Sequence, residues 1–469
     1  MSTLREAGPE KSGTPVPVAR IRTALITLAL AFGLVQLDAT VVTVALPAVR
    51  ADLGGGLALG QWLVDAYVIP FAAAMLAAGA LGDRWGHRQT CSLGCLVFAA
   101  SSTAAALAGS WDVLIAARIV QGLGAAMLLP ASLAMIGTLF PDRVDRARAL
   151  GIWGGIATTG FALGPVVGGL LATHAGWPVV FWINLPLGVL LAVAVRLSCP
   201  AGQRNPRPID RLGTILASLT LAAVAGAVIG AGQGRLLVAG LLVLSAGILA
   251  VAFRSVERRA SQPLIPPSMV RPGPFRAALA TGFVFNFVLY GLLFSVTVVM
   301  TAAFGASVLQ AGLAALPMAV VVSIGATSSG FLSARMGPRR PMVAGFAAAA
   351  IGSLLLVLAW NLRSVVLMVI ATAVVGLISL AMPAMTSVAL GAVAPEQAGT
   401  GAGALNSARQ MGGAIGVALL GAMLNAGQGG WGLTAAAAVA AAGCMVAVRT
   451  SIRATDQRER VEDRRWVSS

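Results

Sequence analysis

Long apolar runs are the feature that most constrains how this chain can fold. Of its 469 residues, 58% are hydrophobic and only 10% are charged, whereas soluble domains carry about 25% charged residues. A helix needs roughly 20 apolar residues to cross a bilayer, and fourteen runs approach or exceed that length. They lie at residues 22–46, 62–82, 90–109, 112–136, 150–173, 179–198, 212–231, 236–254, 277–300, 310–333, 341–360, 365–390, 399–424 and 431–449.

The runs indicate helices rather than strands. Only helices and closed barrels satisfy the backbone hydrogen bonds within lipid, and the strands of a barrel alternate apolar and polar residues. These runs do not alternate. We therefore expect an all-α polytopic membrane protein with 14 transmembrane helices.

The basic residues indicate the orientation of these helices. The net charge of +16 would suggest a nucleic-acid partner in a soluble protein, but here the arginines lie in short loops. If the N-terminus is cytoplasmic, 27 of the 32 Lys and Arg residues fall in the tails or in cytoplasmic loops, as the positive-inside rule requires. We expect a multi-pass plasma-membrane protein with both termini cytoplasmic and no nucleic-acid partner. The high arginine, alanine and glycine content indicates a bacterial source with a GC-rich genome.

Two similar loops suggest that the chain contains related halves. Residues 79–88 follow the second run, and residues 330–340 follow the tenth. Transporters are commonly built from such repeats, with the substrate site between them. We expect cytoplasmic tails and two six-helix bundles, separated by two inserted helices with cytoplasmic linkers. These divisions are a tail at 1–20, a bundle at 21–199, the insertion at 200–275, a bundle at 276–450 and a tail at 451–469.

Acidic and basic residues inside apolar runs are candidates for function, because they are costly in lipid. Asp38 lies in the first run, and an acid that can be neutral or ionised there is what a proton-coupled pump needs. Arg118, in the fourth run, needs a partner; Asp38 is the natural candidate, with Gln121 one turn away. A purely structural ion pair and a snorkelling arginine are the alternatives. Asp65 lies about a turn inside the second run, so it is either functional or solvated at the interface.

Proline and glycine mark features of the helices themselves. Pro47 is expected to end the first helix. In the fifth run, Gly160, Gly164 and Gly168 share one face, which lets another helix approach closely. Pro165 is expected to kink this helix.

The loop at 79–88 is charged and bracketed by glycines. This pattern favours a cytoplasmic ion-pair latch that breaks when the transporter opens, and plain topogenic charge is the alternative. The latch residues are Asp83, Arg84 and Arg88.

Signals for enzymatic chemistry are missing from the sequence. It contains no GxSxG elbow, no phosphate loop with lysine and no histidine-rich metal set. The four cysteines are interpreted as inert thiols, and the glycines at 399–403 as helix packing. We expect no metal, no cofactor and no enzymatic activity, with the proton gradient as the energy source.

Six motifs occur in an order that resembles the major facilitator superfamily, and specifically its fourteen-span drug:proton antiporter branch. The motifs lie at residues 37–47, 79–88, 118–124, 160–169, 176–188 and 406–413. The resemblance implies two six-helix bundles around a central cavity, joined by two extra helices and working by alternating access. It implies proton coupling for Asp38, Asp65 and Arg118. It also implies gating and interdomain packing for Gly164, Pro165 and Gly168, and the latch for Asp83 and Arg84.

The expected substrate is a hydrophobic or amphipathic drug, antibiotic or secondary metabolite, exported in exchange for protons by a monomer in the lipid bilayer. Export of an endogenous metabolite, lipid or siderophore is the alternative; a membrane enzyme and a transporter-like receptor are hypotheses from other classes. The second half has no acid inside its runs, which favours a neutral, anionic or singly charged substrate. Cavity and gate residues are expected to include Gln36, Gln121, Gly164, Pro165, Gly168, Asn286, Asn406 and Arg409.

Overall fold

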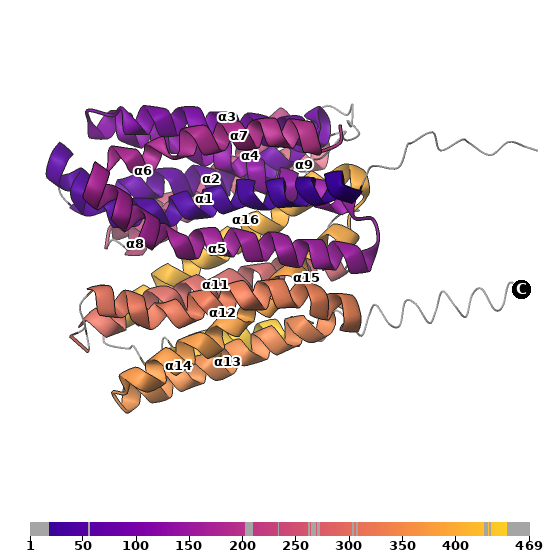
Figure 1. The fold of residues 1–469 in the computed structure, drawn as a ribbon. Helices are drawn as coiled ribbons and strands as arrows, with labels where there is room; N and C mark the ends of the chain where they lie inside the picture. The colour runs from indigo at the N-terminus through magenta and orange to yellow at the C-terminus, as the bar shows by residue number, and fades with distance from the viewer. Residues whose placement is uncertain are drawn as a thin grey trace, which may run out of the picture.

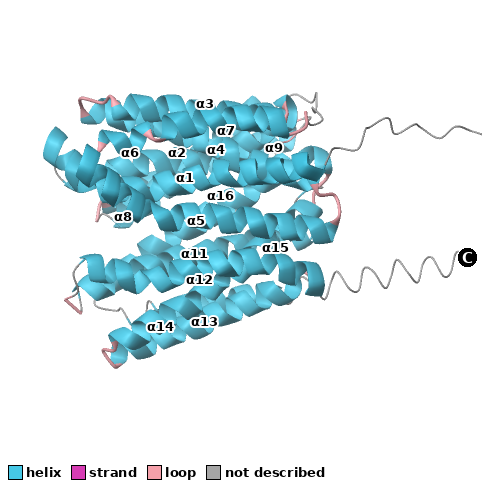
Figure 2. Cartoon of the chain, viewed as in Figure 1, coloured by secondary structure: helices cyan, strands magenta, loops and turns pink. Residues whose placement is uncertain are grey.

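The computed structural model describes most of the chain as a bundle of helices that run roughly side by side (Figure 1). The described residues are 18–54, 57–201, 210–232, 234–260, 263, 269, 273–302, 304–305, 308–425, 430 and 433–447. None of these residues lies in a strand (Figure 2). The predicted tails fall outside the described residues, except that the first helix already begins at Val18.

The first half of the chain forms one group of helices, shown in indigo to magenta in Figure 1. Its helices are α1 (Val18–Leu53), α2 (Leu57–Trp85), α3 (His87–Ala106), α4 (Trp111–Leu139), α5 (Arg143–Ala175), α6 (Pro178–Trp182) and α7 (Asn184–Ser198).

Prolines affect these helices in two different ways. α1 continues past Pro47 to Leu53, so the prediction that this proline ends the helix is wrong. Transmembrane helices tolerate proline because neighbouring groups satisfy the freed carbonyl. At Ile183 the helix is interrupted for one residue between α6 and α7, while its backbone angles stay helical (φ −59°, ψ −29°) and Pro178–Ser198 remains one apolar span. Pro186 explains this break, because it has no N–H to donate and its ring clashes with the carbonyl four residues earlier.

The remaining helices form a linking pair and a second group. The pair is α8 (Arg211–Gly232) and α9 (Leu236–Arg259). The second group is α11 (Gly273–Ala302), α12 (Val308–Met336), α13 (Arg339–Asn361), α14 (Val365–Gly376), η1 (Leu377–Leu380), α15 (Ala381–Gly391), η2 (Pro395–Gln397), α16 (Ala398–Asn425) and an unlabelled helix at Leu433–Ala447. Pro383 explains the short 3₁₀ stretch η1, again through its missing N–H.

Eleven spans within the described residues are long and apolar enough to cross a membrane. α3, α16 and the helix Leu433–Ala447 are not among the eleven. α3 carries several serines and threonines, α16 carries an arginine and amides, and Leu433–Ala447 is short. All three contain buried residues, so they are packed parts of the bundle.

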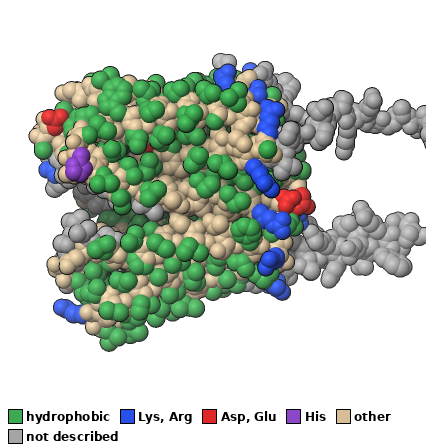
Figure 3. Space-filling view, viewed as in Figure 1, with side chains coloured by type: hydrophobic (Ala, Val, Ile, Leu, Met, Phe, Trp, Pro, Cys, Tyr) green, Lys and Arg blue, Asp and Glu red, His purple; other side chains and the backbone are tan. Residues whose placement is uncertain are grey.

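The outer surface is suited to lipid. α9 exposes many large aliphatic side chains, among them Leu237, which is 78% exposed. Figure 3 shows hydrophobic side chains over most of the visible face and Lys and Arg side chains gathered mainly at one end. We call this the arginine-rich end; α2 and α12 end there, and α5 and α13 begin there. Its arginines include Arg84, Arg143, Arg146, Arg148, Arg335, Arg339 and Arg340.

The two halves pack closely at the arginine-rich end. α5 contacts α12, and α2 contacts α16. Gly151 allows the first contact, since a Cβ there would come within 2.8 Å of the Gly330 Cα. Gly79 allows the second, since a Cβ there would overlap the carbonyl oxygen of Gly399. At the opposite end, the surface is hollowed between the halves (Figure 3).

Candidate functional site

Asp38 is the centre of a buried polar network in the first half. Its side chain is fully enclosed, with the residue only 1% exposed. Arg118 of α4 donates from Nη1 to Asp38 Oδ2 at 2.6 Å. Gln121 and Asn184 donate their amide hydrogens to Asp38 Oδ1 at 3.0 and 2.8 Å. Three helices, α1, α4 and α7, therefore converge on one carboxyl group.

Arg118 is itself well satisfied. Its Nη1 also donates to Gln121 Oε1 at 2.8 Å, and its Nε donates to the carbonyl oxygen of Leu63 at 3.2 Å. The guanidinium carbon lies 4.3 Å from the centre of the Tyr67 ring, where a cation is attracted by the ring face. The predicted pairing of Asp38 with Arg118 and Gln121 is thus present. Snorkelling is ruled out for Arg118, whose residue is 1% exposed.

Three members of this network were not predicted as site residues: Asn184, Ser102 and Tyr67. Asn184 donates to Ser102 Oγ at 2.9 Å, and Ser102 donates to the Phe181 carbonyl oxygen at 2.9 Å. Asn184 is the first residue of α7, directly after the break at Ile183. Asn184 lies within the 176–188 motif, as a polar residue in an apolar run two positions before Pro186, and this was the available sequence signal. Ser102 and Tyr67 gave no comparable signal.

Asp65 lies near this network without being enclosed by it. Its side chain is half-buried on α2. It is two residues from Leu63 and two from Tyr67, both of which contact Arg118. Asp65 is therefore placed on the same stretch of helix as two contacts of the buried pair.

A second polar cluster lies in the other half, on α11 and α16. Asn286 donates from Nδ2 to Gln410 Oε1 at 3.2 Å. Arg409 donates from Nη1 to Asn406 Oδ1 at 3.1 Å. Tyr290 interacts with the side chain of Gln36 on α1. Of these residues, Asn286, Asn406, Arg409 and Gln36 were predicted, whereas Gln410 and Tyr290 were not.

Asp83 connects the halves, but not in the predicted way. Its Oδ1 accepts a hydrogen bond from the Gly399 N–H at 2.9 Å. Its Oδ2 accepts from the Thr400 N–H at 2.9 Å and from the Thr400 hydroxyl at 2.6 Å. Asp83 thus caps the N-terminus of α16, where negative charge is stabilised by the helix dipole. His87 Nε2 lies 3.2 Å from Asp83 Oδ1.

The two arginines of the predicted latch do not supply this connection. Arg88 donates to the carbonyl oxygen of Cys199, within its own half, at 3.4 Å. Arg84 follows Asp83 on α2 and is half-buried. The partner of Asp83 across the halves is a helix end, not an arginine, because the close Gly79–Gly399 approach brings backbone amides directly to the carboxylate.

The predicted glycine face on α5 packs within the first half. A Cβ on Gly160 would overlap Gly33, one on Gly164 would overlap Thr40, and one on Gly168 would come within 2.9 Å of the Val41 carbonyl oxygen. These partners all belong to α1. The interdomain packing expected of Gly164 and Gly168 is made instead by the earlier glycines of α5, such as Gly151. α5 is helical through position 165; the Pro165 side chain is outside the described part of the structure.

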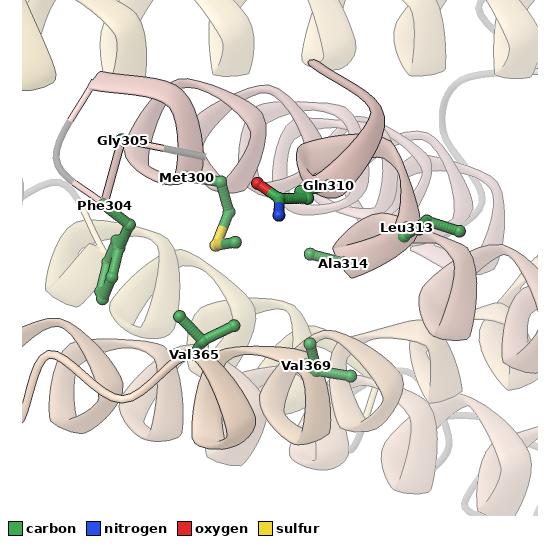
Figure 4. A pocket seen from close by; sticks show the side chains of 8 residues that line it. All are labelled: Met300, Phe304, Gly305, Gln310, Leu313, Ala314, Val365 and Val369. Carbon is green, nitrogen blue, oxygen red and sulfur yellow. The ribbon is translucent and has the colours of Figure 1, made fainter. Parts of the chain in front are cut away.

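A pocket of about 460 Å³ lies away from both polar clusters. It is bordered by the end of α11, the start of α12 and the start of α14 (Figure 4). Gln310 is its one polar side chain among Met300, Phe304, Leu313, Ala314, Val365 and Val369. The pocket is therefore an apolar feature of the second half and adds nothing to the Asp38 network.

Residues 28–417 and 278–465 match the family model described as Major Facilitator Superfamily. The chain belongs to the Major Facilitator Superfamily. It is 35% identical over 446 residues to the tetracenomycin C resistance and export protein of Streptomyces glaucescens, covering 90% of this chain and 80% of that protein. It is 31% identical over 429 residues to the multidrug efflux pump LfrA of Mycolicibacterium smegmatis, covering 91% and 84%.

Solved structures of this superfamily share the fold. The structure of the human organic anion transporter MFSD10 has a TM-score of 0.71 and 17% sequence identity, covering 92% of this chain and 100% of that one. The proton:xylose symporter XylE has a TM-score of 0.66 and 14% identity, covering 91% and 95%. At these identities, the likeness concerns the fold alone.

Proposed function

We propose that this protein is a proton-coupled antiporter of the fourteen-span branch. It exports hydrophobic or amphipathic drugs, antibiotics or secondary metabolites across the plasma membrane by alternating access. The observation that carries this proposal is the buried Asp38–Arg118 pair, held by two further amides at 2.8 and 3.0 Å. The names of the relatives, which are resistance and export proteins, support the substrate class.

The number of spans and their orientation follow from the same argument. α3, α16 and the helix Leu433–Ala447 join the eleven apolar spans to make fourteen. The positive-inside rule then assigns the arginine-rich end to the cytoplasm. The halves are packed together at that end, so the conformation is closed to the cytoplasm, and the hollow at the other end faces outward (Figure 3).

In this conformation a proton reaches Asp38 from outside. Protonation removes the negative charge and leaves Arg118 with neutral partners, namely the Leu63 carbonyl, Gln121 and Tyr67. Breaking a buried ion pair costs about 3–5 kcal/mol. One charge moving down about 100 mV supplies about 2.3 kcal/mol, and a pH difference of about one unit adds about 1.4 kcal/mol. The free energy that one proton gains from the membrane potential and the pH difference is therefore comparable to the cost of breaking the Asp38–Arg118 pair. One proton is enough to shift the balance between outward-open and cytoplasm-open states of similar stability.

The change of state must also open the cytoplasmic end. Opening separates Asp83 from the N-terminus of α16 and Gly151 from α12. Both contacts depend on backbone approach across the halves, so they are lost together when the halves rotate apart. Protonation at Asp38 and opening at Asp83 are thereby parts of one rigid-body change, of the kind expected for repeat-built transporters.

A flux assay tests the proposal. Vesicles that contain the purified protein are loaded with an amphipathic dye, and a pH gradient is imposed. Asp38→Asn removes the titratable proton and is expected to abolish gradient-driven transport while dye binding remains. Asp145→Asn, at an acid whose side chain is 60% exposed, is the matched control. Gradient-driven transport that is unchanged by Asp38→Asn would refute the coupling role.

A further inference from the structure

Arg409 differs from Arg118 in having no carboxylate partner among the residues that the structure describes. Its described contacts are the hydrogen bond to Asn406 and a position 5.3 Å from the centre of the Phe285 ring. Its Nε is buried and has no hydrogen-bond partner. An arginine in a transmembrane helix pairs with an opposite charge or lines a water-filled cavity. Arg409 is half-buried, and its charge has no opposite charge among the described residues.

The second half cannot supply the missing charge. Between residues 273 and 447 the sequence contains one acid, Glu396. That residue is exposed in η2, at the arginine-rich end and outside the apolar spans. In the first half, Asp38 is already occupied by Arg118. Among the described residues, no carboxylate lies within ion-pair distance of the Arg409 guanidinium, so an anion from outside the chain can neutralise it.

The surroundings of Arg409 fit a ligand that is polar at one end and apolar at the other. Asn286 is 2% exposed, and its Oδ1 is buried without a partner. One turn further on α11, Tyr290 interacts with Gln36 across the halves, and its ring meets Phe161 edge-on at 6.4 Å. The polar groups and the aromatic rings thus lie together where the two halves meet.

Glycines leave room for this arrangement. A Cβ on Gly282 would come within 3.1 Å of Arg409 Cγ, so its absence lets the arginine stem lie against α11. A Cβ on Gly413 would come within 3.1 Å of the Tyr290 ring. The absence of side chains on Gly282 and Gly413 therefore lets Arg409 and Tyr290 lie close against the helix backbones.

We infer that Arg409, Asn286, Asn406, Gln410 and Tyr290 form a subsite for the acidic group of an amphipathic organic anion, such as a carboxylate or sulfonate. The Nε edge of the guanidinium presents a planar fork suited to such an oxyanion. Phe161, which is half-buried, contacts the apolar body of the ligand. This inference rests on the proposed export function and narrows its substrate class from amphipathic compounds in general to organic anions.

A pair of fluorescent probes isolates the charge. 8-Anilinonaphthalene-1-sulfonate and N-phenyl-1-naphthylamine share the same aromatic skeleton and differ in the sulfonate. Each is titrated against the purified full chain in nanodiscs, without a pH gradient. Arg409→Gln is expected to weaken sulfonate binding by about tenfold or more, the range for a charged hydrogen bond, and to change naphthylamine binding by less than about twofold. Arg409→Lys is expected to retain a preference for the sulfonate.

Two controls keep the outcome decisive. Arg148→Gln removes the same charge at an exposed position, where the side chain is 49% exposed, and is expected to leave both affinities unchanged. A wild-type protein that binds both probes equally would overturn the inference without any variant, even if Arg409→Gln does not fold. Equal weakening of both probes by Arg409→Gln would mean a packing role, and would also overturn it.

The binding test and the flux test fail independently. Loss of sulfonate preference with intact gradient-driven export would leave the proposed function standing and remove only the anion subsite. Intact sulfonate preference, together with gradient-driven flux that does not depend on Asp38, would leave the anion subsite standing and remove the proposed coupling role of Asp38.

Discussion

Asp83→Asn tests the idea that a capped helix end holds the halves together at the arginine-rich end. Asp83 is 9% exposed and accepts three hydrogen bonds from Gly399 and Thr400 in the first turn of α16, at 2.9, 2.9 and 2.6 Å. Asparagine has nearly the same shape but only one acceptor oxygen. Its NH₂ group would face an N–H donor, so at least one hydrogen bond is lost and the charge is removed.

The expected loss can be stated in free energy. A hydrogen bond to a charged group contributes about 1.5–3 kcal/mol, and the interaction of a carboxylate with the helix dipole adds about 0.3–1 kcal/mol. We expect the closed arrangement to lose about 2–3 kcal/mol. The ratio of open to closed protein at this end then rises about 30- to 150-fold.

Single-molecule energy transfer between labels on the two halves measures this ratio. Arg148 on α5 and Arg340 on α13 are exposed at the arginine-rich end and belong to different halves. The labels are attached at cysteines introduced there, in a background without the four native cysteines. Asp112→Asn, at an exposed acid in the first turn of α4, controls for loss of charge near a helix start. A distance distribution that does not change in folded Asp83→Asn protein would show that the cap is not what closes this end.

Two further substitutions probe the network and the interface. Asn184→Leu removes a 2.8 Å donor to Asp38 and places an apolar side chain against the Asp38–Arg118 pair, so we expect gradient-driven vesicle efflux to fall; an unchanged efflux rate would mean that Asn184 only fills space. Gly151→Val places side-chain atoms where a Cβ is already 2.8 Å from the Gly330 Cα, so we expect transport to fall sharply and the label distance at the arginine-rich end to increase. Gly137→Ala, at a glycine with nothing within 4 Å of its Cβ, should leave both measurements unaffected.

Interruptions in the helices show where local reasoning succeeds and where it fails. Run lengths predicted most of the spans, because lipid leaves the backbone almost no alternative to helix. Prolines were harder to interpret: Pro47 does not end α1, whereas Pro186 accompanies a one-residue interruption between α6 and α7. Both residues lack an N–H, but whether the freed carbonyl finds another donor depends on neighbouring helices. That depends on tertiary contacts, which a local pattern does not contain.

The interface shows the same limit. The face Gly160–Gly164–Gly168 was recognisable as a close-packing surface from its four-residue spacing, and it does pack closely. Its partner is α1 rather than the other half, and the glycines that meet the other half begin at Gly151. The spacing of glycines determines which face of a helix allows close packing, but not which neighbouring helix packs against that face.

The sequence by itself determined that this chain spans a membrane, and it predicted that Arg118 pairs with Asp38. Both conclusions follow from the cost of exposing backbone groups or isolated charges to lipid, which is the same wherever the helix lies. Only the tertiary structure decided that Asn184 completes the pair, that Asp83 caps a helix more than 300 positions away, and that no acid in the described part of the chain pairs with Arg409. Those facts depend on how distant helices cross, because crossing geometry decides which polar atoms come within hydrogen-bond distance.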